Sequence, residues 1–323
     1  MSYAFHLPAI AIIAALALEL LLGDPRWIDA PARLVGGVLR RAELALWTGD
    51  GAADIRRGAL LAIGVIVISA LAALACIAIA ASTNELPGAA VAVLIAWSTL
   101  SFRTPDAAAH QVQRHLAMGK IDAARGAMST LVSLHAAPVD SDAMIRIGVE
   151  AVAVNAFKGA VAPIFFLLVG GPVLAIACMS AGALGRMTGT GGERHRSLGR
   201  AAARINEVAN FIPARVTAVC IAAAAATMLL RGRAALATCT AEARRHDDVN
   251  AGWPIAAMAG ALGIRLSAPA ESNEGEIEPA TFGRDVVPPA IETIAAAREV
   301  MRSTVFIAFC ALAMTRYLML LLI

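Results

Sequence analysis

The sequence predicts an all-α, polytopic integral membrane protein with about five or six apolar helices. Three features of its composition support this fold class. Hydrophobic residues make up 59% of the 323 residues, the mean hydropathy is +0.71, and only 16% of residues are charged. Soluble domains usually have about 25% charged and about 45–50% apolar residues. Alanine supplies much of the apolar content, and small residues let helices pack closely in lipid.

A spanning helix needs about 20 mostly apolar residues. Six segments meet or approach this length: 9–22 (extended back to Ala4), 59–81, 86–102, 160–184, 212–230 and 303–323. The N-terminus lacks a basic region and a small-residue cleavage site, so we expect its helix to be retained. The sequence Gly170-Gly171-Pro172 breaks the fourth segment. That break predicts either an interrupted crossing or two half-helices that enter the membrane and return.

The segments between the spans are polar and rich in arginine. Residues 23–58 predict a short helix over Arg33–Leu46 followed by loops. Residues 103–158 predict two helices. The first is amphipathic and is ended by Gly119, and the second runs over Ile121–Val132.

The basic segments also predict topology. The positive-inside rule places 23–58 and 103–158 in the cytoplasm and the N-terminus outside. After residue 160 the arginine-rich segments conflict with a simple count of crossings, so the topology there stays open. We expect one membrane-embedded domain over 1–323, with 103–158 and 231–300 as mainly cytoplasmic connecting segments.

Charge and cysteine content narrow the class of partner. The net charge of +3 gives no indication of a nucleic-acid partner. Of the 27 basic residues, all but Lys120 and Lys158 are arginine. GC-rich coding explains such a bias. Arginine also binds phosphates and carboxylates through two parallel hydrogen bonds, so an anionic ligand remains an open alternative. The five cysteines are scattered singly, which indicates neither a zinc site nor a disulfide framework.

The first candidate site surrounds the end of the first apolar helix. Glu19 lies four residues before Gly23, and a carboxylate within a membrane helix is costly enough to indicate function. Asp24 and Arg26 follow directly, on either side of Pro25. For Asp24 alone, capping of the next helix is an equal alternative.

The second candidate is a helical stripe. Glu150, Val154 and Lys158 share one face at i, i+4 spacing, and Asn155 lies one position round from it. The stripe predicts either a ligand-facing surface at the membrane boundary or an ordinary solvated helix face.

A third candidate precedes the fifth span. Asn206 and Asn210 are i, i+4 neighbours, Glu207 lies beside them, and Arg215 falls just inside the apolar run. Polar groups at a membrane edge usually have partners, so this motif indicates more than a loop.

Two further motifs are polar turns. The glycine-rich loop before Glu193 and Arg194 offers backbone amides to an anion, although it is not a Walker A sequence. The turn His246–Pro254, which contains Asn250, leads into a helix of small residues over Ala256–Gly263. For this second turn, an ordinary helix start is as good an interpretation as a functional one.

These five motifs, in this order, resemble the sequence pattern of the adenosylcobinamide-phosphate synthase family of cobalamin biosynthesis, the CobD/CbiB type. The resemblance extends from Glu19 to about Leu266. It is strongest in Leu22–Arg26, Gly119–Arg125, Val161–Pro163, Glu193-Arg194, Ala201–Arg215 and Asn250–Gly263.

The resemblance implies a multi-pass protein of the cell inner membrane. It also implies an ATP-dependent ligase that joins aminopropanol, or its phosphate, to a propionate of adenosylcobyric acid through an amide. ATP and Mg²⁺ are the implied cofactors. A corrinoid, an aminopropanol phosphate and membrane lipid are the implied partners, with other cobalamin-pathway proteins as a further possibility and no nucleic acid.

For such a ligase the motifs supply two sets of candidate residues, and metal ligands stay unassigned. The catalytic candidates are Glu19, Asp24, Glu150 and Asn155. The ligand-binding candidates are Arg26, Glu193, Arg194, Glu207, Asn210, Arg215 and Asn250.

The chain departs from the family pattern where carboxylates are usual. Neutral residues replace acids within 133–136 and at Val154, Asn206 and Ile255, while Lys158 and Arg186 replace acids with cations. Each lost carboxylate removes a candidate Mg²⁺ ligand. A catalytically impaired paralogue, acting as a corrinoid-binding or partner subunit, is therefore the alternative. A transporter is a weaker third reading, because the chain lacks an inverted hydropathy repeat.

Overall fold

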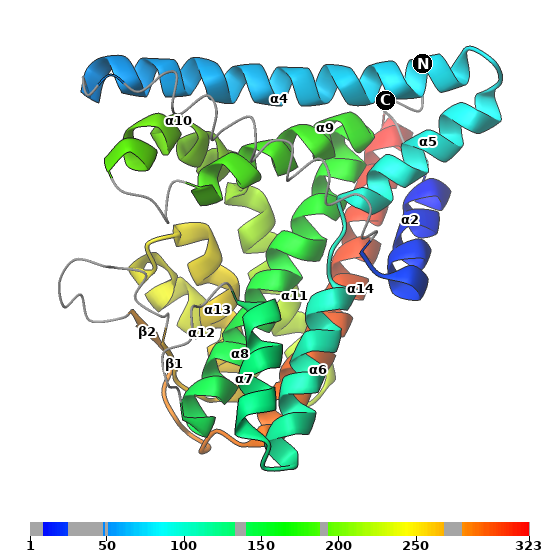
Figure 1. The fold of residues 1–323 in the computed structure, drawn as a ribbon. Helices are drawn as coiled ribbons and strands as arrows, with labels where there is room; N and C mark the ends of the chain where they lie inside the picture. Colours follow the sequence, from blue (N-terminus) through cyan, green and yellow to red (C-terminus); the bar gives the residue numbers. More distant parts are fainter. Residues whose placement is uncertain are drawn as a thin grey trace. The chain divides into compact units, whose positions relative to one another are not determined.

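The computed structural model describes residues 9–24, 48, 51–132, 140–187, 193–267 and 280–322. The chain forms two compact units. Unit 1 comprises Met1–Leu100 and Pro163–Asn210, and unit 2 comprises Ser101–Ala162 and Phe211–Ile323. The described residues are almost entirely helical (Figure 1), which confirms the predicted all-α class. The predicted helix over Arg33–Leu46 and the glycine-rich loop before Glu193 lie outside the described residues.

Unit 1 contains α2 (Ala9–Leu22), α4 (Gly51–Ala81), α5 (Glu85–Ser98), most of α9 (Ala162–Met187) and α10 (Glu193–Ala209). Helix α5 packs against α4 and α2, and α10 packs along α4. Asn84 caps the start of α5, because its side chain accepts a hydrogen bond from the backbone N–H of Leu86. A side chain at Gly88 would collide with Ala81 at 2.7 Å, so glycine there allows α4 and α5 to meet closely.

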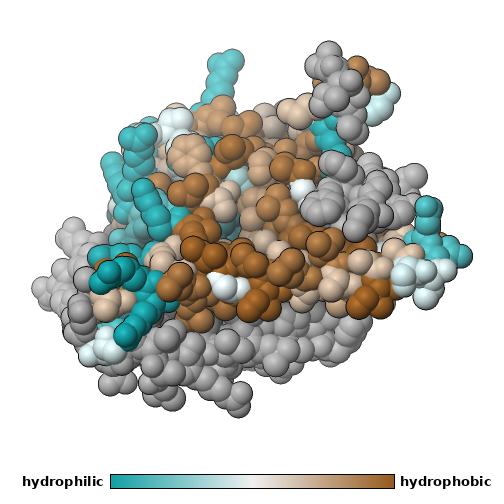
Figure 2. Space-filling view, turned by 90° about the horizontal axis from the view of Figure 1, so that it is seen from above, coloured by the Kyte–Doolittle hydropathy of each residue, from teal (hydrophilic) through white to brown (hydrophobic). Residues whose placement is uncertain are grey.

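Helix α4 has the surface expected of a membrane span. The stretch from Ala53 to Ala81 is long and apolar enough to cross a bilayer, and few of its residues are buried. Figure 2 looks down on this side of the molecule and shows a hydrophobic band with hydrophilic residues toward its ends. In a soluble protein, an exposed apolar surface of this size would cause the molecules to associate. The surface of α4 is instead suited to contact with membrane lipid.

The predicted number of spans is not confirmed. Among the described residues, three helical stretches are long and apolar enough to cross: Ala53–Ala81, Glu85–Ala117 and Ser141–Leu184. A bent pair, Gly199–Ala209 with Phe211–Thr227, makes a fourth if it counts as one span. The first predicted span survives as the shorter apolar helix Ala11–Leu22, and the predicted span 303–323 is not among the three. The all-α class is therefore confirmed, and the count of five or six spans is not confirmed by the described residues.

The break predicted in the fourth span falls within α9. Gly170 and Gly171 leave helical backbone angles, and Gly171 has a φ of 68°. Only glycine adopts that left-handed conformation at low cost, and the proline that follows removes a backbone donor. The sequence signal and the kink therefore coincide.

Unit 2 holds the remaining helices and a two-stranded sheet. They are α6 (Arg103–Ala117), α7 (Ile121–Leu131), α8 (Ser141–Asn155), the π-helical turn η1 (Ala156–Val161), α11 (Phe211–Thr227), α12 (Gly232–Glu242), the 3₁₀ turn η2 (Ala243–Arg245), α13 (Val249–Leu262), β1 (Leu266–Ser267), β2 (Thr281–Phe282) and α14 (Ile291–Leu322). Helices α6 and α7 confirm the two predicted between 103 and 132. Gly119 lies between them with a φ of 68°.

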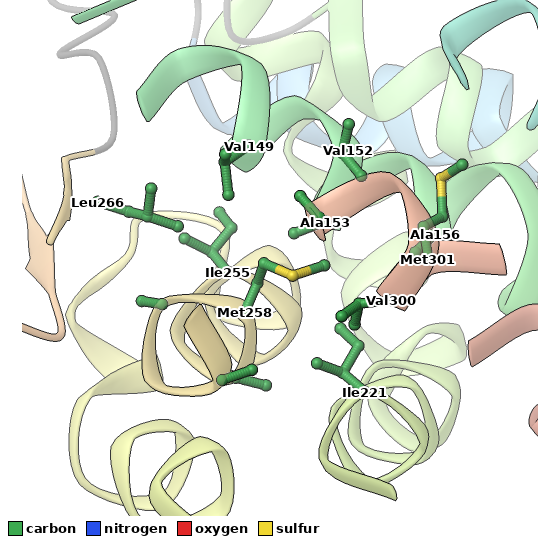
Figure 3. Packing of buried hydrophobic residues seen from close by; sticks show 14 of the residues in the cluster. Val149, Val152, Ala153, Ala156, Ile221, Ile255, Met258, Leu266, Val300 and Met301 are labelled. Atoms are coloured by element: carbon green, nitrogen blue, oxygen red, sulfur yellow. The ribbon is translucent and has the colours of Figure 1, made fainter. Parts of the chain in front are cut away.

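The core of unit 2 forms where α8, α11, α13 and α14 meet. In Figure 3 the side chains of Met258, Ala153 and Val300 converge from three of these helices. Helix α13 is the small-residue helix that the sequence predicted, and nearly all of it is buried. Gly260 shows why small residues are needed, because a side chain there would lie 2.5 Å from the carbonyl oxygen of Ala234 in α12. Gly263 then ends α13 in the left-handed conformation.

Candidate functional site

A group of polar side chains gathers at the start of α13 in unit 2. Asp248 caps this helix, since its Oδ1 accepts hydrogen bonds from the backbone N–H groups of Asn250 and Ala251, both at 3.1 Å. The backbone N–H of Asp248 donates in turn to Nδ1 of His246 at 2.9 Å. The His246 ring stacks on Phe282 of β2. These contacts fix the turn that enters α13.

Lys158 reaches this turn from η1. Its Nζ lies 2.7 Å from Oδ2 of Asp248. Burial alone would raise the pKa of Asp248, but the Lys158 charge and the Ala251 N–H outweigh burial and hold that pKa below its usual value. The charge of Lys158, which replaces an acid of the family pattern, is therefore balanced by Asp248.

Arg215 approaches from the second turn of α11. Its guanidinium carbon lies 3.4 Å from the ring centre of Phe211 and 4.7 Å from that of Trp253. Its Nη1 donates to the Phe211 carbonyl oxygen at 2.6 Å and to Oδ1 of Asn250 at 3.4 Å. Asn250 is only 3% exposed. Two residues predicted separately, Arg215 and Asn250, are thus brought together by packing of α11 on α13.

A second cation, Arg244, lies on the turn that packs against the start of α13. A side chain at Gly252 would lie 2.0 Å from the carbonyl oxygen of Ala243, so glycine is required where η2 crosses the start of α13. Arg244 belongs to η2, and its charge acts on Arg215. Among the described residues, Arg215 has no carboxylate partner.

The predicted stripe runs from α8 into η1, with Glu150 buried and Val154, Asn155 and Lys158 partly exposed. Glu150 is only 8% exposed, and its Oε2 has no hydrogen-bond partner in the described part of the chain. Asn155 donates from Nδ2 to the carbonyl oxygen of Ala151 at 2.7 Å, within its own helix. A buried carboxylate without a partner is costly, so Glu150 keeps its place as a functional candidate.

The other predicted residues belong to unit 1 or lie outside the description. Glu19 is fully buried in α2, and Asp24 lies just beyond its end. On α10, Glu207 pairs with Arg204 at 2.5 Å. Asn210 follows that helix and donates to Oδ1 of Asn206 at 2.8 Å. Three candidates have no described side chain: Arg26, Glu193 and Arg194.

Sequence reasoning did not select several residues of the α13 site: Phe211, Arg244, Asp248 and Trp253. A signal existed for Asp248, because an aspartate immediately before a run of small apolar residues is a typical helix cap. A signal also existed for Phe211, which stands at i, i+4 spacing from Arg215, whereas Trp253 is far from Arg215 in sequence.

A second polar cluster, which the sequence also did not reveal, joins α6 to α14. Arg298 donates to both carboxylate oxygens of Asp106, from Nε at 2.8 Å and from Nη2 at 3.1 Å. Arg302 adds a third bond to Asp106 at 2.7 Å. Nη1 of Arg298 lies 3.0 Å from Nδ1 of His110. Figure 1 shows α6, α8 and α14 side by side, and this cluster lies on the α6–α14 contact.

Comparison with known proteins gives one consistent result. Residues 12–301 match the family model described as CobD/Cbib protein. The chain is 34% identical over 258 residues to the cobalamin biosynthesis protein CobD of Geobacter metallireducens, covering 79% of this chain and 80% of that protein. It is 32% identical over 288 residues to the protein of the same name in Klebsiella pneumoniae, covering 88% and 90%. It is 32% identical over 260 residues to the cobalamin biosynthesis protein CbiB of Salmonella typhimurium, covering 79% and 81%. No solved structure matches.

Proposed function

This chain belongs to the CobD/CbiB family, and on that premise we propose that it acts in cobalamin biosynthesis. The proposed step joins aminopropanol, or its phosphate, to a propionate side chain of adenosylcobyric acid. The observation that carries the proposal is the family match over residues 12–301. The relatives named for cobalamin biosynthesis support it, because each aligns over about four fifths or more of its own length.

The polar site of unit 2 suits this chemistry. Both proposed substrates carry anionic or polar groups that need oriented donors, and Arg215 presents a guanidinium that no carboxylate of the described residues neutralises. Asn250 adds a buried amide at the same place. Amide formation also needs a group that accepts the proton of the amine, and Glu150 is the buried carboxylate of unit 2 that we propose for this role.

ATP and Mg²⁺ enter the proposal from the family resemblance. A carboxylate must be activated before an amine displaces its oxygen, and ATP supplies that activation when bound. Within the described residues no three His, Cys, Asp or Glu side chains meet in a group that would hold a metal ion. Mg²⁺ that binds with a nucleotide needs only one or two protein carboxylates, so we assign no ligand to it.

We also propose the inner membrane as the location, with the arginine-rich connecting segments in the cytoplasm. The apolar helices support membrane insertion. The positive-inside rule supports the orientation of the segments 23–58 and 103–158. Water-soluble anionic substrates would then reach the site from the cytoplasmic side.

Complementation tests the function. In a strain that lacks the synthase, this chain is expected to restore adenosylcobinamide or its phosphate, measured by chromatography of the corrinoids. Asn250→Ala is expected to reduce that product about tenfold, because a buried hydrogen-bonding group is worth about 1–3 kcal/mol. Arg233→Lys, an exposed change on α12, serves as the control. Absence of product with normal amounts of wild-type protein in the membrane would overturn the proposal.

A binding experiment identifies the alternative function. If the purified protein binds adenosylcobyric acid but forms no product with ATP, Mg²⁺ and the amine, the chain is a binding or partner subunit. If it turns the substrates over, that alternative is excluded.

A further inference from the structure

Arg215 differs from the arginines that fasten unit 2 together. Those arginines make ion pairs with carboxylates: Arg125, Arg146, Arg245, Arg298 and Arg302. The described contacts of Arg215 are instead two aromatic rings, a carbonyl oxygen and an amide oxygen. Arg215 lies at the start of the second turn of α11. No carboxylate among the described residues neutralises the charge of Arg215.

The geometry leaves part of the guanidinium available. Both hydrogen bonds of Arg215 to described residues use Nη1, and the rings of Phe211 and Trp253 contact the guanidinium group. Nη2 and Nε have no hydrogen-bond acceptor among the described residues, and the side chain is partly exposed. A ligand that binds there meets a group that is already oriented, so little side-chain entropy is lost on binding.

A second positive charge strengthens the same place. Arg244 is exposed on η2, and its charge acts unfavourably on Arg215. The contact between Gly252 and Ala243 packs η2, which carries Arg244, against the start of α13, where the Trp253 ring contacts Arg215. The charge of Lys158, in contrast, is already balanced by Asp248. An anion that binds near Arg215 and Arg244 relieves their repulsion.

We propose that Arg215 and Arg244, with Asn250 holding Arg215 in place, form a subsite for a phosphate group. A phosphate monoester carries close to two negative charges at neutral pH, which matches two arginines better than a single carboxylate does. This proposal deepens the proposed function and rests on it for the source of the phosphate. Under that function the phosphate belongs to the aminopropanol phosphate, and Arg215 is a binding residue for the amine substrate.

Inorganic phosphate tests the subsite without any turnover. Phosphate binding to the full chain in a phosphate-free detergent is followed by ³¹P line broadening. Arg215→Lys is expected to weaken binding about tenfold or more, because lysine keeps the charge but loses the fork and the planar stack. Arg233→Lys is the matched control and is expected to bind as the wild type does. Equal binding by Arg215→Lys and wild type would overturn the proposal.

A second variant covers the case in which Arg215→Lys does not fold. Arg244→Ala changes an exposed residue and is expected to weaken phosphate binding about threefold to tenfold, with an unchanged unfolding temperature. Unchanged phosphate binding in this variant would equally overturn the subsite.

Two further arms identify the source of the phosphate. In steady-state assays Arg215→Lys is expected to raise KM for aminopropanol phosphate about tenfold and to leave KM for unphosphorylated aminopropanol unchanged. If vesicles with phosphatidylglycerol displace inorganic phosphate and aminopropanol phosphate does not, a lipid headgroup is the ligand and the substrate assignment is overturned. If phosphate binding depends on Arg215 while the wild type forms no product, the subsite stands and the proposed function fails.

Discussion

Two arginine clusters within unit 2 show how differently one residue type is used. On the α6–α14 contact, Arg298 is about as buried as its partner Asp106, and the carboxylate accepts three charged hydrogen bonds. At the start of α13, Arg215 contacts rings and neutral oxygens. The first cluster is electrostatically complete and joins two helices. In the second cluster, the positive charge and the N–H donors of Arg215 can bind an anion.

The groups that contact an arginine thus distinguish one that joins two helices from one that can bind a ligand. A desolvated arginine is tolerated where a carboxylate meets it with good geometry, as Asp106 meets Arg298. Arg215 is instead placed beside faces of aromatic rings, which attract a cation without neutralising it. Substitutions in the first cluster are therefore expected to change stability, whereas substitutions in the second change ligand binding.

The largest effect is expected from Asp106→Ala. The change leaves Arg298, whose side chain is 10% exposed, without its carboxylate. Loss of one partner of a buried pair costs about 3–5 kcal/mol, so the unfolding temperature in detergent should fall by several degrees. Asp122→Asn removes an acid that is 97% exposed and is the control. If both variants unfold at the same temperature, the α6–α14 cluster does not fasten unit 2.

The features of unit 2 that were predicted correctly are those that depend on residues close together in the sequence. Gly119 separates two helices, and a run of small residues marks α13, because each signal lies within one or two helical turns. The partners of the charged residues are not local. Asp106 and Arg298 are 192 positions apart, and Lys158 and Asp248 are 90 apart. No periodicity within one helix reveals such a pair.

The candidate site was therefore predicted in pieces. Arg215 and Asn250 appeared in separate motifs, and only packing of α11 on α13 brings them to 3.4 Å. The predicted number of spans is not confirmed among the described residues, for a related reason. Hydropathy finds apolar stretches, but whether a stretch such as 9–22 is long enough depends on where its helix begins and ends.

A smaller effect is expected from Lys158→Ala, and it depends on pH. The pKa of Asp248 in the folded protein is below its ordinary value of 3.8, so this group stabilises the fold above that pH and the contribution is lost as pH falls through the folded pKa. The pair is more than one third exposed, so solvent screening limits its value to about 1 kcal/mol or less. The wild type should thus be slightly more stable than the variant at pH 7, and the difference should shrink toward pH 3. A difference that is the same at both pH values would show that Lys158 acts through packing and not through its charge.

The smallest effect is expected from Glu299→Ala, at the exposed edge of the α6–α14 cluster. Glu299 accepts a hydrogen bond from Arg302 at 2.9 Å, one turn away on the same helix, and both side chains are about half exposed. Pairs of this spacing contribute about 0.2–0.5 kcal/mol before salt screening, so the unfolding temperature should change by about a degree or less. Arg302 keeps its bond to Asp106 in this variant, which leaves the buried part of the cluster intact. The comparison between Asp106→Ala and Glu299→Ala therefore isolates burial, since the two carboxylates share the same arginine. If Glu299→Ala lowers the unfolding temperature as much as Asp106→Ala does, exposure does not set the strength of these ion pairs. The distinction between an arginine that joins helices and one that binds a ligand must then rest on ligand measurements alone.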